Sequence, residues 1–280
     1  MQPVYYLHGV RCSELNADLN DRALSYGDGF FETMLLRLTP QGVVFPMLKY
    51  HRQRLQQSGR ILGLDVSLLE LELTQAALDF YRNAKSGDYV CKLHVCREAG
   101  VRGYYGASGK PVSRICITAK PESNDSSQAL TLCRHPLSRN PALAGIKHLN
   151  RLDQVVARNE WQDEFYDGVM LNIQGRPVEC TAHNLFWVKD GQIYTADLSQ
   201  EGVDGVVRRW LLSQFEVMIG CYPLEALLQA DEVFITNALK GIVSVRAIGD
   251  KIFGAGKVAS HVKQQYQSWI DSIPVLADKG

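Results

Sequence analysis

A short polar segment in the middle of the chain does most to limit how this sequence can fold. Residues 121–128 read PESNDSSQ and carry no aliphatic or aromatic side chain, although strand-like sequence lies on both sides. A segment of this composition cannot bury enough apolar surface to order itself and is typical of a linker. We therefore expect an N-terminal α+β domain over residues 1–120, an interdomain linker over 121–128 and a C-terminal domain over 129–280.

Size and charge narrow the class of function. The 280 residues are 46% hydrophobic, which is enough to build two ordinary cores. Thirty acidic residues balance thirty basic ones, so the charge does not point to nucleic acid or an anionic membrane. No apolar run is long enough to cross a bilayer, and the start MQPVYYLHGVRCSEL lacks the features of a secretion signal. We expect a cytoplasmic protein with a small-molecule substrate and no membrane or nucleic-acid partner.

The cysteines do not predict a structural framework. There are seven, an odd number, and none forms a CxxC pair. A disulfide network or a zinc site is therefore not expected, and no metal site is predicted. Most of these cysteines should act as small buried hydrophobic residues.

Hydrophobic periodicity predicts a mixture of helices and hairpins. The expected helices cover residues 46–64, 66–85, 150–164 and 206–215. The expected strands cover residues 5–10, 30–38, 89–98, 113–120, 129–137, 168–173, 177–188, 192–196 and 231–238. The turn sequences QGR and KDG join three of these strands into a meander. This order favours an α+β fold over a regular βαβ wind.

One lysine has an unusual setting in the segment GIKHLNRLDQVV, residues 145–156. Asn150 and Asp153 have the spacing of a helix N-cap and its acidic partner. Three apolar residues follow with helical spacing: Leu152, Val155 and Val156. Lys147 would then lie just outside the helix start, where the helix dipole and burial favour the neutral, nucleophilic amine. Lys147 is therefore a candidate Schiff-base lysine, and the alternative is a solvated cation on a connecting loop.

A pyridoxal phosphate enzyme also needs a carboxylate for the pyridine nitrogen and a site for the phosphate. Glu179 lies in an otherwise uncharged strand, where a charge is costly unless it is paired. The segment EGVDGVVRRW has a glycine turn that opens a helix and could receive an anion. Arg54 lies on a cationic helix and could bind phosphate with its guanidinium fork. Each feature also has a purely structural explanation. Glu179 could occupy an exposed strand position, the glycine turn could serve to cap the helix, and Arg54 could lie on a solvated helix face.

Taken together and in this order, these motifs resemble the fold-type IV pyridoxal 5′-phosphate (PLP) enzymes. The segments DRALSYGDGFFET, HRQRL, VECTAHNLFWV and EGVDG carry the resemblance, which covers nearly the whole chain. This family includes branched-chain and D-amino acid aminotransferases and the aminodeoxychorismate lyases. The resemblance implies a two-domain α+β fold like that of D-amino acid aminotransferase, with PLP as the cofactor. Within the family, SRNPALAGIKHLNRLDQVV is most similar to the lysine segment of the lyase branch.

The resemblance also implies roles for individual residues. Lys147 would form the Schiff base with PLP, and Glu179 would hydrogen-bond the pyridine nitrogen. The phosphate would be bound by the following residues: Arg54, the backbone of Val203 and Asp204, and the strand end at Asn237 and Ala238.

Substrate contacts are implied in two places. Arg102 and Tyr104 lie on a glycine-rich loop that closes over the substrate in relatives, and Arg102 would face a carboxylate. Phe31 stands where D-amino acid aminotransferases tend to have a tyrosine that helps to hold a carboxylate. The second carboxylate anchor is open between Arg97 and the backbone near Asn237.

The expected activity is that of a carbon–oxygen lyase. The branch resemblance implies conversion of 4-amino-4-deoxychorismate to 4-aminobenzoate and pyruvate in folate biosynthesis. The alternative is a class IV aminotransferase for D- or branched-chain amino acids, which would use the same cofactor residues. Relatives are homodimers, so a homodimer is expected here as well.

Overall fold

The computed structural model describes residues 2–100, 103–106, 109–122, 128–254 and 256–276. The chain forms two compact units. Unit 1 comprises Met1–Glu122, Lys147–Asn150 and Ser272–Gly280, and unit 2 comprises Ser123–Ile146 and Arg151–Asp271. The predicted linker includes the point of division, but residues 123–127 lie outside the described part of the chain. The lysine segment groups with the N-terminal elements, although we expected it in the C-terminal domain.

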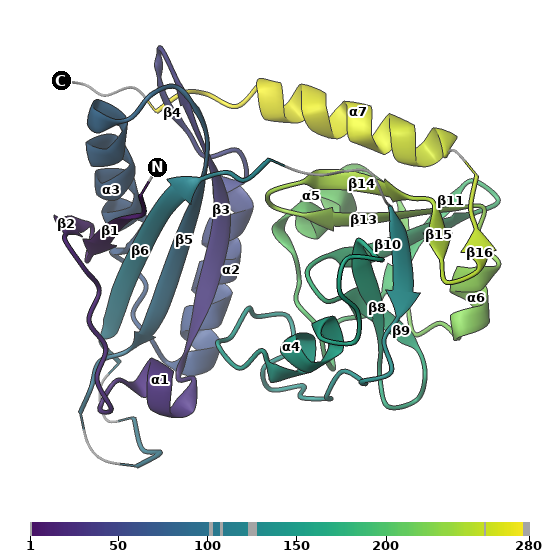
Figure 1. Cartoon of the computed structure of the whole chain (residues 1–280), viewed down its shortest axis with the longest axis horizontal. Helices are drawn as coiled ribbons and strands as arrows, with labels where there is room; N and C mark the ends of the chain where they lie inside the picture. The colour runs from purple at the N-terminus through teal and green to yellow at the C-terminus, as the bar shows by residue number, and fades with distance from the viewer. Residues whose placement is uncertain (1, 101–102, 107–108, 123–127, 255, 277–280) are drawn as a thin grey trace. The chain divides into compact units, whose positions relative to one another are not determined.

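Unit 1 is built on a six-stranded antiparallel sheet in the order β2-β1-β6-β5-β3-β4 (Figure 1). Its strands are β1 (Val4–Leu7), β2 (Val10–Cys12), β3 (Gly29–Thr39), β4 (Gly42–Val44), β5 (Gly87–Arg97) and β6 (Pro111–Ala119). Its helices are α1 (Arg22–Tyr26), α2 (Leu48–Leu62) and α3 (Leu69–Asn83). The expected helices at 46–64 and 66–85 are therefore present as α2 and α3.

The two faces of this sheet have different environments because side chains alternate along a strand. Along β3, Phe30, Met34 and Leu36 are buried and share one hydrophobic core with residues of α2 and α3. The intervening residues Phe31 and Thr33 are only half-buried. The sheet thus has one face covered by helices and one face that can present polar groups.

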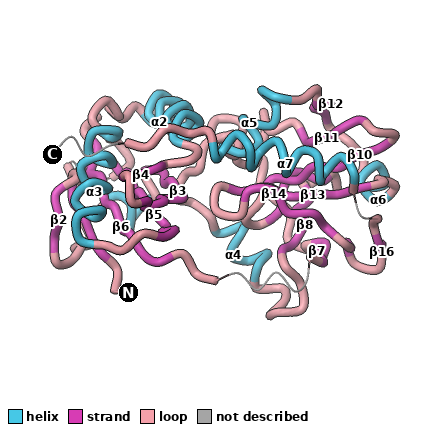
Figure 2. The backbone as a smooth tube through the Cα atoms, turned by 90° about the horizontal axis from the view of Figure 1, so that it is seen from above, coloured by secondary structure: helices cyan, strands magenta, loops and turns pink. Residues whose placement is uncertain are grey.

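Unit 2 contains a ten-stranded sheet. Its strands are β7 (Ala129–Leu132), β8 (Asp167–Leu171), β9 (Pro177–Cys180), β10 (Asn184–Lys189), β11 (Gln192–Ala196), β12 (Val217–Gly220), β13 (Glu232–Asn237), β14 (Gly241–Val245), β15 (Ala247–Ile248) and β16 (Lys251–Ile252). Its helices are α4 (Leu152–Arg158), α5 (Val206–Gln214), α6 (Leu224–Leu228) and α7 (Lys257–Asp271). Helix α7 runs along β13 and β14 (Figure 2).

The prediction of one strand over residues 177–188 was wrong, because this segment forms β9, a turn and β10. The buried carboxylate of Asp167 accepts hydrogen bonds from the backbone N–H groups of Thr181 and Ala182. His183 Nδ1 lies 2.6 Å from the same carboxylate. Asp167 thus provides the hydrogen-bond acceptors for the turn at residues 181–183, although it is distant from the turn in sequence. The periodicity of a strand does not reveal such long-range hydrogen bonds.

The predicted helix at 150–164 was also wrong in its limits and in its cap. Helix α4 covers only Leu152–Arg158, and no side chain caps it. Asn150 instead donates a hydrogen bond to the carbonyl of Gly27. Asp153 accepts hydrogen bonds from the Ser138 backbone and contacts His135. Both presumed cap residues are therefore used in other contacts.

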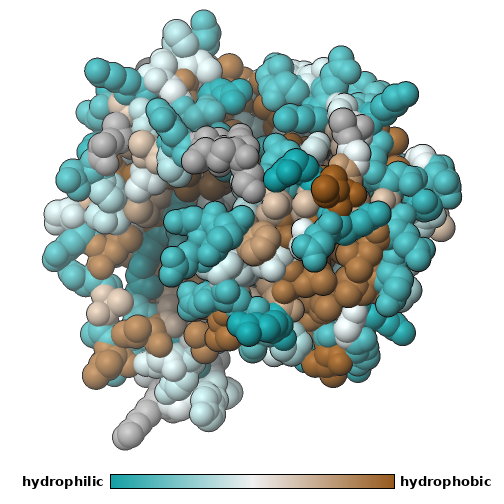
Figure 3. All heavy atoms as spheres, turned by 45° about the vertical axis from the view of Figure 1, so that its right-hand side comes forward, coloured by the Kyte–Doolittle hydropathy of each residue, from teal (hydrophilic) through white to brown (hydrophobic). Residues whose placement is uncertain are grey.

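The apolar face expected for this helix does not enter a core. Leu152 is 74% exposed, and Val155 and Val156 are also exposed, whereas Ala157 is buried. Figure 3 shows one face of the molecule, on which hydrophobic side chains gather beside hydrophilic ones. None of the described helices is both long and apolar enough to span a bilayer.

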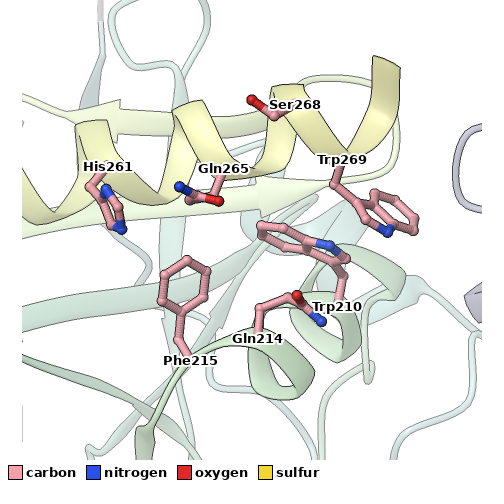
Figure 4. Close-up of a pocket in the computed structure, with 7 residues that line it drawn as sticks. All are labelled: Trp210, Gln214, Phe215, His261, Gln265, Ser268 and Trp269. Atoms are coloured by element: carbon pink, nitrogen blue, oxygen red, sulfur yellow. The ribbon is translucent and has the colours of Figure 1, made fainter. Parts of the chain in front are cut away.

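A cavity of about 470 Å³ lies between α5 and α7 (Figure 4). Its lining is mostly aromatic and amide: Trp210, Gln214, Phe215, His261, Gln265, Ser268 and Trp269. The ring of Trp210 also contacts that of Tyr266 on α7, with centroids 5.0 Å apart. None of the residues predicted to carry chemistry lines this cavity, and its rings pack α7 onto α5.

Candidate active site

Lys147 is held against β3 of unit 1 by backbone hydrogen bonds. The Phe31 N–H donates to the carbonyl of Lys147 at 2.9 Å, and the Leu149 N–H donates to the carbonyl of Gly29 at 3.0 Å. Lys147 therefore lies in a short extended segment that continues the sheet. Because α4 begins only at Leu152, the expected effect of the helix dipole on Lys147 is not supported.

The side chain of Lys147 borders an aromatic ring. Its Nζ lies 4.7 Å from the centroid of the Phe31 ring. A cation at this distance is attracted by the ring face, and the ring covers one side of the amine. The predicted catalytic lysine and the predicted substrate residue Phe31 are thus neighbours within one unit.

A buried charge cluster occupies the covered side of the same sheet. Arg54 Nε donates to Glu32 Oε1 at 2.7 Å, and a second Arg54 nitrogen donates to Oε2. His51 Nδ1 lies 2.7 Å from Glu32 Oε2. All three side chains are buried. Arg54, predicted to bind phosphate, is therefore a buried cation whose position depends on Glu32.

Opposing effects set the protonation states in this cluster. Burial raises the pKa of Glu32, but the charges and hydrogen bonds of Arg54 and His51 outweigh it and lower the pKa to about 2. Burial lowers the pKa of His51, Glu32 opposes this, and the positive charges of Arg54 and Lys147 lower it further. Near neutral pH the cluster is an ionised carboxylate between an arginine and a neutral histidine. That histidine donates its Nδ1–H to Glu32.

In unit 2, Glu179 is buried on β9 and is held by the backbone of Val203. The Val203 N–H donates to Glu179 Oε2 at 2.8 Å. The Val203 carbonyl accepts a hydrogen bond from Asn184 Nδ2 at 2.7 Å. Because both polar groups of one residue are used, the loop before α5 has a defined position beside the Glu179 carboxylate.

The same loop is attached to the residues that precede the lysine. Gly145 donates to the carbonyl of Gly202 at 2.9 Å and accepts a hydrogen bond from the Asp204 N–H at 3.0 Å. The backbone N–H groups of Val203 and Asp204 therefore donate within the protein. The predicted phosphate donors at these two positions are already occupied by protein acceptors.

The start of α5 supplies other donors for an anion. The first-turn N–H groups of Val206 and Val207 have no acceptor within the helix, because they precede its first backbone hydrogen bond, from Arg209 to Gly205. The N-cap, Gly205, has no side chain, and a Cβ there would lie 1.9 Å from Asn184 Oδ1. These two residues lie three residues after the predicted donors Val203 and Asp204 and are a further candidate for the phosphate contact. The signal for it was the second glycine of EGVDG.

The strand end at Asn237 and Ala238, predicted to contact the phosphate, contains hydrogen bonds of its own. Asn237 Oδ1 accepts hydrogen bonds from the backbone N–H groups of Leu239 and Lys240, so its side chain closes its own turn. The hydroxyl of the preceding Thr236 is buried and has no hydrogen-bond partner among the described residues.

Thr236 lies in line with Glu179. Asn184 pairs with Glu179 on one side and with Thr236 on the other, so the three side chains share one face of the sheet. Thr236 is a candidate contact that sequence reasoning missed, although it adjoins the predicted position.

The other predicted substrate residues are only partly described. Tyr104 is 90% exposed and packs edge-on against Tyr26, while Arg102 lies outside the described residues. Arg97 donates to the Asp28 carboxylate and to backbone carbonyls at the end of α2. Its guanidinium is committed to structural contacts, so it is a poor candidate for the second carboxylate anchor.

Comparison with known proteins identifies the family. Residues 29–248 match the amino-transferase class IV family. The chain belongs to this family. It is 33% identical over 257 residues to an aminodeoxychorismate lyase of Vibrio harveyi, covering 88% of this chain and 91% of that protein. It is 30% identical over 279 residues to a putative branched-chain-amino-acid aminotransferase of Methanocaldococcus jannaschii, covering 94% of each.

The fold agrees with a solved member. The crystal structure of 4-amino-4-deoxychorismate lyase from Pseudomonas aeruginosa superimposes with a TM-score of 0.81 at 33% identity, covering 94% of this chain and 98% of that one. The predicted two-domain fold-type IV class is confirmed, and so is the prediction that the chain is an enzyme.

The predicted cofactor, PLP, is also confirmed by the family, and features of this structure fit it. A buried carboxylate, Glu179, suits a protonated pyridine nitrogen. The first-turn N–H groups of α5, which have no acceptor within the helix, and the Thr236 hydroxyl, which has no partner among the described residues, suit phosphate oxygens. Arg54 supplies a buried cation.

We predict that Glu32 makes stability fall at acid pH. Its pKa in the folded state, about 2, lies below the ordinary value of 4.5. Its contribution is therefore fully present above about pH 4.5 and is lost as the pH falls towards 2. Near pH 7, Glu32→Gln should destabilise the protein by about 3–5 kcal/mol, because Arg54 loses its buried partner. Urea unfolding between pH 7 and pH 3 measures both effects.

The matched control is Glu14→Gln, which changes an exposed carboxylate. It should leave the pH dependence of unfolding as in the wild type. If Glu32→Gln showed the same loss of stability between pH 5 and 3 as the wild type, the assigned role of Glu32 would be wrong.

We also predict that Gly205→Ala weakens PLP binding by about tenfold or more, because the new methyl group must displace Asn184 or the helix start. The dissociation constant is measured from the absorbance of bound cofactor. Gly254→Ala is the control, since a Cβ at Gly254 meets nothing within 4 Å. Equal affinities for the two variants, with unchanged melting temperatures, would contradict the assignment.

Proposed function

We propose that this chain is an aminodeoxychorismate lyase of folate biosynthesis, which converts 4-amino-4-deoxychorismate to 4-aminobenzoate and pyruvate. The observation that carries the proposal is the 33% identity of this chain to one such lyase over nearly the full length of both proteins. A second such lyase, whose crystal structure is solved, is also 33% identical to this chain. Lys147 lies in the segment that most resembles the lyase branch. Its backbone is attached to the sheet, as a fixed catalytic amine requires.

Several residues would hold the cofactor. Lys147 would bind it covalently and Glu179 would keep its pyridine nitrogen protonated. The phosphate would be held by Arg54, the N–H groups of Val206 and Val207, and the Thr236 hydroxyl. When bound, PLP supplies an electron sink for carbanion chemistry.

The chain itself supplies the base. The Lys147 amine takes the proton from the amine-bearing ring carbon of the substrate. The bond between the neighbouring ring carbon and the enolpyruvyl oxygen then breaks, and the ring becomes aromatic. The proton held by Lys147 passes to the departing enolpyruvyl group, which leaves as pyruvate. The reaction needs no oxidant or reductant, and the face of Phe31 shields the amine from water on one side.

An aminotransferase is the second candidate. The observation in its favour is the 30% identity to a putative branched-chain-amino-acid aminotransferase. Such an enzyme would convert bound PLP to its amine form when D-alanine or L-leucine is added, and this changes the cofactor absorbance. That change, without pyruvate release from aminodeoxychorismate, would favour the aminotransferase and exclude the lyase.

We also propose that the chain is a cytoplasmic homodimer. Helix α4 exposes Leu152, Val155 and Val156, an apolar surface of the kind that marks protein interfaces. All seven cysteines are free thiols, which suits a reducing compartment.

Lys147→Ala should lower the rate of pyruvate and 4-aminobenzoate formation by at least about 10²–10⁴-fold, because it removes the base and the covalent attachment. Pyruvate is followed with a coupled dehydrogenase and 4-aminobenzoate by its fluorescence. The control is Lys189→Ala, which removes a partly exposed lysine paired with Asp231. Retained turnover in Lys147→Ala would refute the mechanism.

Leu152→Asp should shift the protein from dimer to monomer at micromolar concentration, because a carboxylate is costly to bury in an interface. Sedimentation velocity measures the oligomeric state. Leu71→Asp makes the same change at another exposed leucine, on α3, and should leave the dimer intact. A monomeric wild type would disprove the dimer, and a dimeric Leu152→Asp would show that α4 is not its interface.

A further inference from the structure

The half-buried face of the unit 1 sheet brings a second lysine close to Lys147. Lys92 on β5 pairs with Thr33 on β3, and the neighbouring His94 pairs with Phe31. These side chains therefore share one face of the sheet. Lys92 Nζ lies 5.4 Å from the centroid of the Phe31 ring, whose distance from Lys147 Nζ is 4.7 Å. The two amines thus border one ring and are no farther apart than the sum of these distances.

The other cations of this region already have carboxylate partners. Arg114 pairs with Asp21, and both Arg22 and Arg97 pair with Asp28. Lys92, by contrast, forms no ion pair with any residue in the described part of the chain, and its side chain is exposed. It is therefore a cation beside the catalytic amine that is available to an incoming anion.

His94 does not compete with Lys92 for that anion. Burial, with the positive charges of Lys92 and Arg114, lowers the pKa of His94 to about 4. The imidazole is therefore neutral near pH 7, and its ring packs against Phe31 with centroids 5.5 Å apart. This face of the sheet therefore carries the rings of Phe31 and His94, with the Lys147 amine as the catalytic group and the Lys92 ammonium as a binding group.

We infer that the ammonium of Lys92 binds the ring carboxylate of the substrate. This inference rests on the proposed lyase function. In 4-amino-4-deoxychorismate the ring carboxylate lies across the six-membered ring from the amine-bearing carbon, whose proton Lys147 takes. The two amines that border the Phe31 ring match the two ends of this substrate, and the Phe31 ring can cover the six-membered ring between them. Lys92 thereby takes the role of the anchor for which Arg97 is unsuited.

The role of the substrate's ring carboxylate in the reaction determines how loss of Lys92 should affect KM and kcat. The ring carboxylate is not changed by the reaction, so its ion pair with Lys92 is the same in the bound substrate and in the transition state. Loss of such an interaction raises KM and leaves kcat nearly unchanged. A hydrogen bond to a charged group of this kind corresponds to an affinity change on the order of ten- to a hundredfold.

The first experiment compares Lys92→Gln, Lys92→Arg and wild type as PLP-loaded enzymes. Lys92→Gln should raise KM about ten- to a hundredfold with kcat within about threefold, and Lys92→Arg should recover most of the loss. The cofactor absorbance should be the same in all three. Lys49→Gln is the matched control, because Lys49 also lies over an aromatic ring, that of Tyr50, in the same unit. It should leave KM unchanged.

The second experiment separates this inference from the proposed function. Binding of 4-aminobenzoate and of aniline, which lacks the carboxylate, is measured to wild type and Lys92→Gln by calorimetry. Lys92→Gln should weaken 4-aminobenzoate about ten- to a hundredfold and leave aniline unchanged. An equal loss for both ligands, or no loss for either, would overturn the role of Lys92. Absence of pyruvate formation by the wild type would instead overturn the lyase proposal, and the two-ligand comparison would still test Lys92.

Discussion

The backbone hydrogen bonds between Lys147–Leu149 and β3 are the interactions on which the candidate site depends most. A lysine has a long, flexible side chain, so its amine is positioned only if its backbone is fixed. Here the fixing element is β3, whose other side chains Phe30, Met34 and Leu36 pack in the core of unit 1. The position of the Lys147 amine therefore depends on the same packing that stabilises unit 1.

The charges around this site follow one physical rule. A buried charge is tolerated only with a partner, and most of the charges here have one. Glu32 is shared by Arg54 and His51, while Glu179 is held by a backbone N–H that belongs to a loop fixed by Asn184. Lys92 differs from these groups, because its side chain is exposed and forms no ion pair with any residue in the described part of the chain.

Sequence reasoning succeeded for the fold class, the enzyme class and the cofactor. The motifs around Lys147, Glu179 and Arg54 resembled those of one enzyme family, and the family match confirms the enzyme class and cofactor that they implied. The errors fell where long-range contacts override local pattern. Asp167 divides the expected strand at 177–188, and Asn150 and Asp153 leave α4 uncapped because each has a distant partner.

The sequence by itself determined the α+β class and the family, because the first follows from periodicity and the second from the resemblance of motifs along the chain. Only the tertiary structure decided which polar groups are already satisfied. The backbone N–H groups of Val203 and Asp204 and the guanidinium of Arg97 donate hydrogen bonds within the protein, which their positions along the chain do not reveal. Lys92 emerged because antiparallel pairing places β5 beside β3, a neighbourhood that spacing along the chain does not encode.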